Sequence, residues 1–474
     1  MPAKLPTMAH WSRHNSKYLP RMKTSASIFI LLVVTFTTLA QPISGQWSGT
    51  LNAGAMKLKV VFHITKTESG YSSTMDSPDQ GAMKIPVTAT TFEAPNLKLE
   101  ISKLQIEYKG VLKNDTLSGT FIQSGMPIPL TLTKTLIPAS KRPQEPKPPF
   151  SYYTEDLTFR NSAANISLAG TLTLPAKDGN YPAVILIGGS GPQNRDGEIA
   201  GHKPLLVLAD HLTKNGIAVF RFDDRGVGKS EGNFQTASIP DFTSDVESAL
   251  AYLKTRKEIN KQKIGLVGHS EGGIIAPMLA AKSPDVKFIV MLAGPGLPGY
   301  KLLLLQMEKM QRAMGVPDKM VQESAKFYGE AYQMIWESPE NDPSLKTRVG
   351  KYVTFQMGIQ APEGAANGVV SSITNPWMVS FLKYDPVPVL SRVKIPVLAL
   401  TGEKDVQVLP AENLAGIKNI LTESGNKNFT VKEYPGLNHM FQTCTTCYPF
   451  EALEETFAPE VLKDVTEWVL GRTK

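Results

Sequence analysis

The sequence predicts an α/β domain with a doubly wound, mostly parallel sheet and a helical insertion, preceded by a small all-β domain. After residue 150, short apolar runs alternate with amphipathic helical patterns, which is typical of parallel strands buried on both faces. A long helical interval, from about Gly299 to Asp385, separates two of these runs. Residues 46–135 instead alternate apolar and polar side chains in short runs, as half-buried strands do.

The length of 474 residues exceeds what one ordinary hydrophobic core organises, so at least two domains are expected. Hydrophobic residues make up 42% and charged residues 20%, which is the balance of a globular protein. Residues 1–40 hold five basic and no acidic side chains, so most of the formal charge of +7 belongs to that segment. The rest of the chain is close to neutral, and we therefore expect no nucleic-acid partner.

Residues 1–40 have the pattern of a secretory signal peptide. Basic residues at Arg21 and Lys23 precede an apolar run from Ile28 to Phe36, and small residues lead to an expected cleavage site after Ala40. A retained membrane anchor is the alternative, but the run is short for a transmembrane helix. We expect export to the periplasm or the extracellular space, with no stable membrane span after cleavage.

Residues 46–135 are expected to form a small antiparallel sheet or partial barrel. The alternation is clearest in four runs separated by turn clusters: residues 57–62, 97–101, 117–121 and 130–133. Residues 136–150 are rich in proline and charge, which predicts an extended, semi-rigid linker. The α/β domain then occupies residues 151–474, and the sequence does not reveal the task of the β domain.

The strands of the α/β domain are expected at five short apolar runs: residues 183–187, 218–222, 264–267, 288–292 and 397–400. The interval between the fourth and fifth runs, about residues 300–385, predicts a helical cap. Its methionines are interpreted as packing mainly within the cap's own core: Met307, Met310, Met314, Met320 and Met334.

The pentapeptide Gly268-His269-Ser270-Glu271-Gly272 follows one predicted strand directly and leads into a helical pattern. This setting is typical of a nucleophile elbow, in which a strained turn exposes the serine hydroxyl and the glycines let the backbone approach closely. The helix start also supplies unpaired N–H groups and the positive end of a dipole. A chance match to this short pattern is the alternative, and the strand–turn–helix context makes Ser270 the candidate nucleophile.

A serine nucleophile needs a base, and in this arrangement the chain order is serine, acid, histidine. Only His439, in a glycine-containing loop late in the chain, follows Ser270. The other histidines precede it: His10, His14, His63, His202, His211 and His269. His439 is therefore the candidate base, with a plain surface histidine as the alternative.

The acid is expected just after the predicted strand at residues 397–400. Asp405 is preferred because the turn at Gly402 places it where a carboxylate can reach back to the base. Glu403 is the second choice, and Asp385 is an outside candidate. The acid orients the histidine and stabilises its protonated form.

A developing oxyanion needs two backbone donors. The residue after the nucleophile, Glu271, is expected to supply one N–H. The loop Gly188-Gly-Ser-Gly-Pro192 follows a predicted strand and is expected to supply the other, from Ser190 or next from Gly191. A phosphate-binding loop is the rival interpretation, but no G-K-[ST] follows and Pro192 removes a donor.

Cys444 and Cys447 are the two cysteines of the chain. In an exported protein, a pair at this spacing is expected to close a tight local disulfide. A thiol-redox pair is the alternative, but the strand–helix setting of such motifs is missing.

Three motifs in the second half of the chain resemble those of EstD-type bacterial carboxylesterases, within the serine-aminopeptidase-like group of α/β-hydrolases. They are Gly188–Gly197 (GGSGPQNRDG), Arg221–Ser230 (RFDDRGVGKS) and Gly268–Gly273 (GHSEGG). The resemblance covers about Tyr152 to the C-terminus, and the N-terminal β-rich part is similar to one that accompanies such esterases. The cysteine pair is not part of the pattern.

This resemblance implies the α/β-hydrolase fold and activity on short-chain acyl esters, with Ser270, Asp405 and His439 at the matching catalytic positions. Arg225 and Asp196, which lie in the shared motifs, are interpreted as structural. We therefore expect a serine carboxylesterase that takes a small-molecule ester through an acyl-enzyme intermediate, without a metal or organic cofactor. A peptidase or amidase using the same three residues, and a non-catalytic binding protein, are the alternatives. The sequence leaves the oligomeric state open.

Overall fold

The computed structural model describes residues 43–473, apart from 54–55, 68–69, 78–81, 124, 136–140, 314, 359–363 and 446–452. The predicted signal peptide and Cys447 lie outside the described residues. Within the described ranges, no helix combines the length and the apolar character that crossing a membrane requires.

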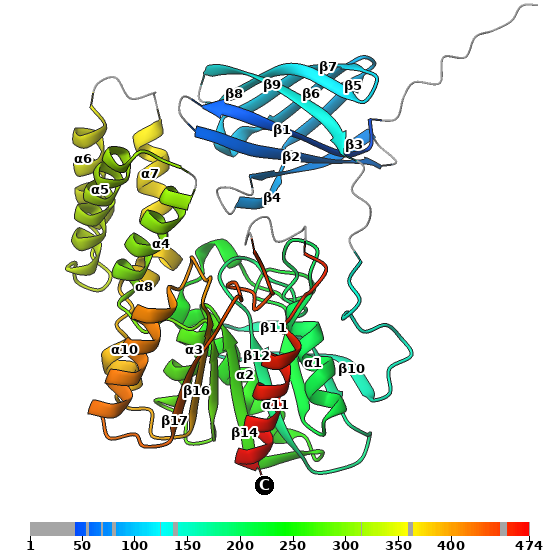
Figure 1. The fold of residues 1–474 in the computed structure, drawn as a ribbon, viewed down its shortest axis with the longest axis vertical. Coiled ribbons are helices and arrows are strands. Elements are labelled where there is room, and N and C mark those ends of the chain that lie inside the picture. The colour runs from blue at the N-terminus through cyan, green and yellow to red at the C-terminus, as the bar shows by residue number, and fades with distance from the viewer. Residues whose placement is uncertain are drawn as a thin grey trace, which may run out of the picture. The chain divides into compact units, whose positions relative to one another are not determined.

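Nine strands form one antiparallel sheet, so the predicted all-β domain is present (Figure 1). In chain order they are β1 Gly45–Ala53, β2 Met56–Thr67, β3 Gly70–Ser77, β4 Ala82–Pro86, β5 Ala89–Glu93, β6 Asn96–Ile101, β7 Ile106–Lys113, β8 Thr116–Gln123 and β9 Met126–Thr135. Their order in the sheet is β4-β3-β2-β1-β9-β8-β7-β6-β5. The sheet is larger than the four predicted runs, which fall in β2, β6, β8 and β9.

The sheet curls, so that the edge strand β5 returns to β3 near the other edge. The hydroxyl of Thr90 donates to the hydroxyl of Ser73 at 2.9 Å, and the N–H of Val87 donates to the Ser73 carbonyl at 3.1 Å. The curled sheet encloses a core of its inward side chains, including Trp47, Phe62, Tyr108, Leu117 and Phe121. This is the geometry of a partial barrel.

A second, eight-stranded sheet forms the α/β domain (Figure 1). Its strands are β10 Tyr153–Asn161, β11 Ile166–Leu174, β12 Tyr181–Ile187, β13 Ala218–Phe222, β14 Ile259–His269, β15 Ile289–Leu292, β16 Val397–Gly402 and β17 Phe429–Tyr434. The order is β10-β11-β13-β12-β14-β15-β16-β17. Strand β11 pairs antiparallel with both β10 and β13, and all the other neighbours in the sheet are parallel. The predicted mostly parallel sheet is therefore correct.

Both faces of this sheet are covered, which explains why its strands read as continuous apolar runs. Along β12, the side chains of Ala183 and Ile185 enter one core, and those of Val184 and Leu186 enter the other. Helices α2 Ile239–Thr255, α3 Gly272–Ala280, α9 Pro386–Leu390 and α10 Pro410–Glu423 pack on the first face. Helices α1 Pro204–Lys214 and α11 Pro459–Thr473 pack on the second. The sheet is thus doubly wound.

In the described residues, six helices lie between β15 and β16; the last, α9, packs on the sheet, and the first five lie where the helical cap was predicted. These five are α4 Gly299–Ala313, α5 Asp318–Trp336, α6 Leu345–Met357, α7 Ala365–Ile373 and α8 Pro376–Leu382. Their shared core is built from Tyr332, Ile335, Val349, Val353 and Leu382, among others. We refer to residues 299–382 as the helical insertion.

The interpretation that Met307, Met310, Met320 and Met334 pack mainly within the insertion's core is wrong. Met320 is 42% exposed, and Met307, Met310 and Met334 are only half-buried. Met314 lies outside the described residues. The core of the insertion is instead filled mainly by β-branched, aromatic and leucine side chains.

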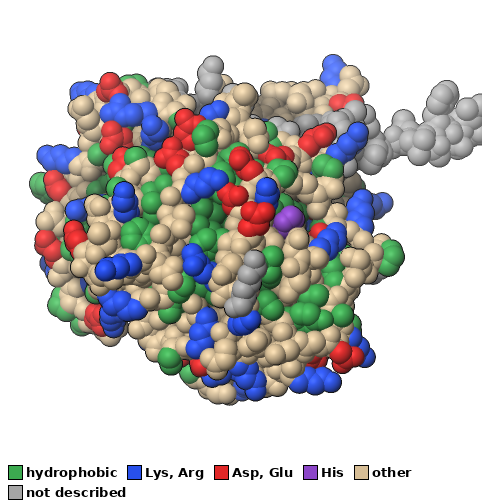
Figure 2. Space-filling model, turned by 60° about the horizontal axis from the view of Figure 1, so that its bottom comes forward, with side chains coloured by type: hydrophobic (Ala, Val, Ile, Leu, Met, Phe, Trp, Pro, Cys, Tyr) green, Lys and Arg blue, Asp and Glu red, His purple; other side chains and the backbone are tan. Residues whose placement is uncertain are grey.

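Lysine, arginine, aspartate and glutamate side chains are interspersed over the face drawn in Figure 2, with hydrophobic side chains between them. On this face the charges of either sign do not gather into one continuous patch. This distribution agrees with the near-neutral balance of the chain after residue 40.

Candidate active site

Ser270 lies on a sharp turn between β14 and α3. Its φ of +53° is in the left-handed region, which is strained for a residue with a side chain. The N–H of Ser270 donates to the carbonyl of Leu292 at 2.8 Å, and its carbonyl accepts from the N–H of Gly273 at 2.8 Å. Hydrogen bonds on both sides therefore hold the strained turn in place.

The glycines of this turn are required by close backbone approaches. A Cβ atom on Gly268 would lie 1.9 Å from the carbonyl oxygen of Gly272. A Cβ atom on Gly272 would lie 2.5 Å from the carbonyl oxygen of Ile187, on the neighbouring strand β12. Side chains at either position would push the turn away from the strand ends.

Asp405 and His439 form a buried hydrogen-bonded pair. The Nδ1 atom of His439 lies 2.7 Å from Oδ2 of Asp405, and the two residues are 5% and 2% exposed. The other carboxylate oxygen accepts from the N–H groups of Gln407 and Val408, each at 2.8 Å. A carboxylate can only accept, so the proton of neutral His439 lies on Nδ1 and its Nε2 is left as a base.

The other two acid candidates are occupied elsewhere. Glu403 accepts the N–H of Gly436 at 2.8 Å, and Asp385 caps helix α9 by accepting the N–H of Val387 at 2.9 Å. Of the three predicted acids, the structure brings Asp405 to His439.

Hydrogen bonds from buried side chains stabilise the loop that carries His439. The side-chain oxygen of Asn438 accepts the N–H groups of Met440 and Gln442, each at 2.9 Å. The Gln442 side chain is buried and contacts the ring of His202 at 3.2 Å. Neither His202 nor Gln442 was predicted to matter, because they become neighbours only through the fold.

His269, just before Ser270, joins the nucleophile turn to this loop. Its Nε2 atom donates to the backbone carbonyl of His439 at 2.9 Å, and the two ring centroids are 4.8 Å apart. Burial, with a smaller contribution from the neighbouring imidazole, lowers the pKa of His269 to about 4. At neutral pH, His269 is therefore an uncharged donor that fixes the backbone of the candidate base.

The carboxyl group of Glu271 is buried behind the same turn. Burial raises its pKa to about 7, although hydrogen bonds from Trp377 and Ser190 oppose that shift. The indole Nε1 of Trp377, in α8 of the insertion, donates to Oε2 of Glu271 at 2.9 Å. This contact was not predicted, because the two residues are far apart in the sequence.

The predicted oxyanion loop lies against the nucleophile turn. A Cβ atom on Gly189 would lie 3.2 Å from the Cβ of Ser270. Gly191 has a φ of +93°, which favours glycine, and an added Cβ there would meet open space. Beyond the loop, the guanidinium group of Arg195 donates two hydrogen bonds to Asp223, at 2.9 and 2.8 Å, and its backbone N–H donates a third at 2.9 Å, which ties the segment to the end of β13.

A recess beside the turn is lined by Gly189, Gly191, Asp224, Glu271 and apolar side chains of α2 and α3. Burial raises the pKa of Asp224 well above its usual range, and Glu271 contributes to this shift. The N–H of Gln193 donates to Asp224 at 2.9 Å. Three carboxyl groups therefore line the recess, those of Asp224, Asp245 and Glu271, and of these Asp245 is paired with Arg225.

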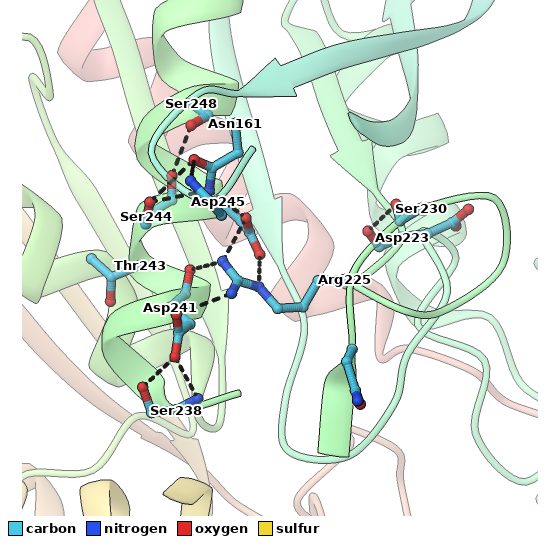
Figure 3. Close-up of polar contacts among 12 residues, drawn as sticks. Asn161, Asp223, Arg225, Ser230, Ser238, Asp241, Thr243, Ser244, Asp245 and Ser248 are labelled. Atoms are coloured by element: carbon cyan, nitrogen blue, oxygen red, sulfur yellow. Dashed lines mark hydrogen bonds and ion pairs between the residues drawn. The ribbon is translucent and has the colours of Figure 1, made fainter. Parts of the chain in front are cut away.

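Arg225 and Asp196 have structural partners, as interpreted from the sequence. The guanidinium group of Arg225 bonds to both carboxylate oxygens of Asp245, at 2.7 and 2.9 Å, and to Asp241 at 3.0 Å (Figure 3). Asp196 pairs with Arg221 of β13. The first pair fixes the loop after β13 to α2, and the second fixes the segment after the Gly-rich loop to β13 itself.

Cys444 is disulfide-bonded, and its expected partner Cys447 lies outside the described residues. In the part of the chain that the structure describes, no group of three or more His, Cys, Asp or Glu side chains is arranged to hold a metal ion.

One family model matches half of the chain, and hydrolases are among the similar proteins. The model of the family described as serine aminopeptidase, S33, matches residues 204–443. Esterase EstD of Thermotoga maritima is 25% identical over 292 residues, which cover 62% of this chain and 61% of the esterase. A putative carboxymethylenebutenolidase of Synechocystis sp. is 28% identical over 142 residues, covering 29% of this chain and 57% of that protein. The chain thus matches less than two thirds of the length of either relative.

Solved structures of esterases are among the structural neighbours. Est1E of Butyrivibrio proteoclasticus, with ferulic acid bound, is 18% identical with a TM-score of 0.41 and covers 67% of this chain and 99% of that one. Esterase Pf2001 of Pyrococcus furiosus is 17% identical with a TM-score of 0.43, covering 68% and 92%. The family match and the doubly wound sheet lead to one conclusion: the chain belongs to the serine aminopeptidase S33 family of hydrolases and has the α/β-hydrolase fold.

Proposed function

We propose that this protein is a serine carboxylesterase that hydrolyses short-chain acyl esters through Ser270, His439 and Asp405. The observation that carries the proposal is the buried 2.7 Å hydrogen bond between His439 and Asp405, on a loop that His269 fastens to the Ser270 turn. Such a pair leaves Nε2 of the histidine free to take the proton of a serine hydroxyl.

In the proposed reaction, Nε2 of His439 takes the hydroxyl proton while Oγ of Ser270 bonds to the ester carbonyl carbon. The tetrahedral intermediate collapses, its bond to the alcohol oxygen breaks, and His439 returns the proton to the leaving alcohol. Water then gives a proton to His439 and attacks the acyl-enzyme. The second intermediate expels the Ser270 oxygen, which regains its proton, and the carboxylic acid leaves.

The oxyanion formed in each half-reaction would be stabilised by the N–H of Glu271 and an N–H of the Gly-rich loop, from Ser190 or Gly191. The closeness of Gly189 to Ser270 supports this role for the loop. One donor of this kind contributes about two to three orders of magnitude to turnover in other serine hydrolases.

The helical insertion would act as a cap that helps to select the acyl or alcohol group. Its helix α8 contacts the nucleophile turn, since the indole of Trp377 donates to the carboxyl group of Glu271. Deleting the insertion from a protein that still folds should change the chain-length preference, and an unchanged preference would contradict a cap.

The proposal is tested by steady-state hydrolysis of p-nitrophenyl butyrate with the wild type and a Ser270→Ala variant. We expect turnover by the wild type and a loss of at least about a thousandfold in the variant. If a folded wild-type protein does not hydrolyse esters of any chain length, the proposal is wrong.

A peptidase or amidase is the second candidate, and the recess beside Ser270 favours it. The carboxyl groups of Asp224 and Glu271 face this recess and, when ionised, would attract the ammonium group of a peptide amino terminus. An aminoacyl p-nitroanilide, assayed beside the ester, decides between the two. Faster turnover of the anilide would replace the esterase by an aminopeptidase, and no turnover of either would favour a binding protein.

Export remains a separate proposal. The basic and apolar pattern of residues 1–40 supports cleavage after Ala40. Expression of the whole chain in a bacterium, followed by fractionation and N-terminal sequencing, should find a periplasmic or secreted product beginning near Gln41. An intact chain in the cytoplasm would contradict export.

A further inference from the structure

We propose that the side-chain carboxylate of Glu271 is a positioning group, which ties the Ser270 turn to the Gly-rich loop and to the helical insertion at once. The inference rests on the proposed function, because it assigns a task to a side chain whose own backbone N–H is a proposed oxyanion donor. The carboxylate itself takes no part in the bond changes of the reaction.

The geometry is a junction of three chain segments. Glu271 is 4% exposed and is the N-cap residue just before helix α3. Its Oε2 accepts the indole N–H of Trp377 at 2.9 Å, and the hydroxyl of Ser190 hydrogen-bonds to the same carboxyl group. One side chain therefore connects the nucleophile turn with residues 81 and 106 positions away in the sequence.

Helix α8, which carries Trp377, is itself anchored to the α/β domain. Trp377 packs against Phe381 at a centroid distance of 5.4 Å, and Phe381 lies in the core beside the sheet. The hydroxyl of Ser380 accepts the N–H of Ile239 at 3.0 Å, at the start of α2. Because both ends of the contact are anchored in the α/β domain, a shift of Glu271 would displace α8 or the turn.

The two contacts need a group that only accepts hydrogen bonds. Trp377 has a donor and no acceptor, and an ionised carboxylate accepts both the indole and the hydroxyl without loss. Through its hydrogen bond with Ser190, the carboxylate fixes the Gly-rich loop, which supplies one proposed N–H donor to the oxyanion. The backbone N–H of Glu271 itself is the other proposed donor. The distance between the two proposed donors is thus set by one side chain.

The pKa of Glu271 depends on the titratable and charged groups that surround its carboxyl group. Asp224, on the loop after β13, is the facing carboxyl group, while Asp245 on α2 is paired with Arg225. On the nucleophile turn, His269 is uncharged at neutral pH, and His439 approaches from the base loop. Since burial raises the pKa of Glu271 to about 7 and each donor lowers it, loss of either donor should raise this pKa further.

The test compares Glu271→Gln, Trp377→Phe and Ser190→Ala with the wild type, by kcat and KM for p-nitrophenyl butyrate across pH 5 to 9. Trp468→Phe is the matched control, because its indole N–H is buried without a hydrogen-bond partner among the described residues. Alanine at position 190 keeps the backbone N–H. Thermal unfolding of each variant checks that it is folded.

We expect Glu271→Gln to lower kcat about tenfold to a hundredfold with KM changed less than about threefold, since it misplaces the donors without removing them. We expect it to lose one ionisation from the acid limb of the kcat profile. Trp377→Phe and Ser190→Ala should move that ionisation to higher pH, and Trp468→Phe should leave it unchanged. If Glu271→Gln does not fold, the two donor variants decide.

Wild-type kcat and an unchanged acid limb in Glu271→Gln, with an active wild type, would overturn this inference alone. The inference would also be overturned if the acid limb of the kcat profile stayed at the wild-type pH in both Trp377→Phe and Ser190→Ala. An inactive wild type would instead overturn the proposed function, and the inference with it.

Discussion

His439 Nδ1 and Asp405 Oδ2 are 2.7 Å apart, and neither residue is more than 5% exposed. Replacing Asp405 by asparagine should preserve the shape of this pair while removing its charge. The amide would no longer fix the proton on Nδ1 or stabilise the protonated ring. We expect kcat for p-nitrophenyl butyrate to fall by roughly three to four orders of magnitude, as measured at saturating substrate.

Glu403→Gln is the matched control for this change, because Glu403 was a candidate acid and bonds instead to the backbone of Gly436. We expect its kcat to stay within about threefold of the wild type, since the variant keeps an acceptor for that N–H. Equal losses in the two variants would show that Asp405 has no special role.

His269 should tolerate glutamine better than leucine. Glutamine keeps a donor at about the position of Nε2, whereas leucine leaves the carbonyl of His439 without the 2.9 Å hydrogen bond. We expect His269→Leu to lose about 1–3 kcal/mol of unfolding free energy and at least about tenfold in kcat. Urea denaturation and ester turnover measure the two effects, and identical behaviour of both variants would contradict the positioning role.

Gly268→Ala should disrupt the nucleophile turn. The added Cβ would lie 1.9 Å from the carbonyl oxygen of Gly272, so the backbone must shift. We expect a loss of stability of about 2 kcal/mol or more, together with a large loss of activity.

Gly471→Ala is the opposite case, because an added Cβ in α11 meets nothing within 4 Å. Alanine favours a helix more than glycine does, and we expect a gain of about 0.5–1 kcal/mol. Thermal unfolding of both glycine variants gives the comparison. A stable, active Gly268→Ala protein would show that the turn does not need the close approach.

The stability of the protein should depend on pH through Glu271. Its pKa is about 7 in the folded protein and near 4.5 when exposed, so between these pH values the folded form binds more protons than the unfolded form. Ionisation therefore destabilises the fold as pH rises, by about 3 kcal/mol in total. We expect the unfolding free energy of Glu271→Gln, minus that of the wild type, to rise by up to this amount between about pH 4 and pH 8. A difference that is constant with pH would contradict this origin.

Much of the α/β domain follows from the sequence, because its strands are buried on both faces and read as apolar runs. All five predicted runs are strands, from β12 to β16. The antiparallel strands β10 and β11 and the edge strand β17 were not predicted, since their mixed polar and apolar composition lacks that signal. In β17, for example, Phe429-Thr-Val-Lys-Glu-Tyr434 alternates along an edge that is partly exposed.

The candidate site could be predicted only where chain order and local turns constrain it. Ser270 sits on a turn whose glycines are visible in the sequence, and elimination leaves His439. The contacts of Glu271 with Trp377 and of His202 with Gln442 join segments 106 and 240 residues apart, which periodicity and spacing do not reveal. The burial that shifts the pKa of Glu271 and Asp224 is likewise a property of the fold.

The most direct test of the account is covalent labelling of the folded protein with a fluorophosphonate, followed by peptide mass spectrometry. The account predicts one labelled residue, Ser270, with labelling abolished in Ser270→Ala and slowed by at least about a hundredfold in His439→Ala. Labelling at another residue, or a folded wild type that leaves Ser270 unlabelled, would contradict a serine nucleophile activated by His439.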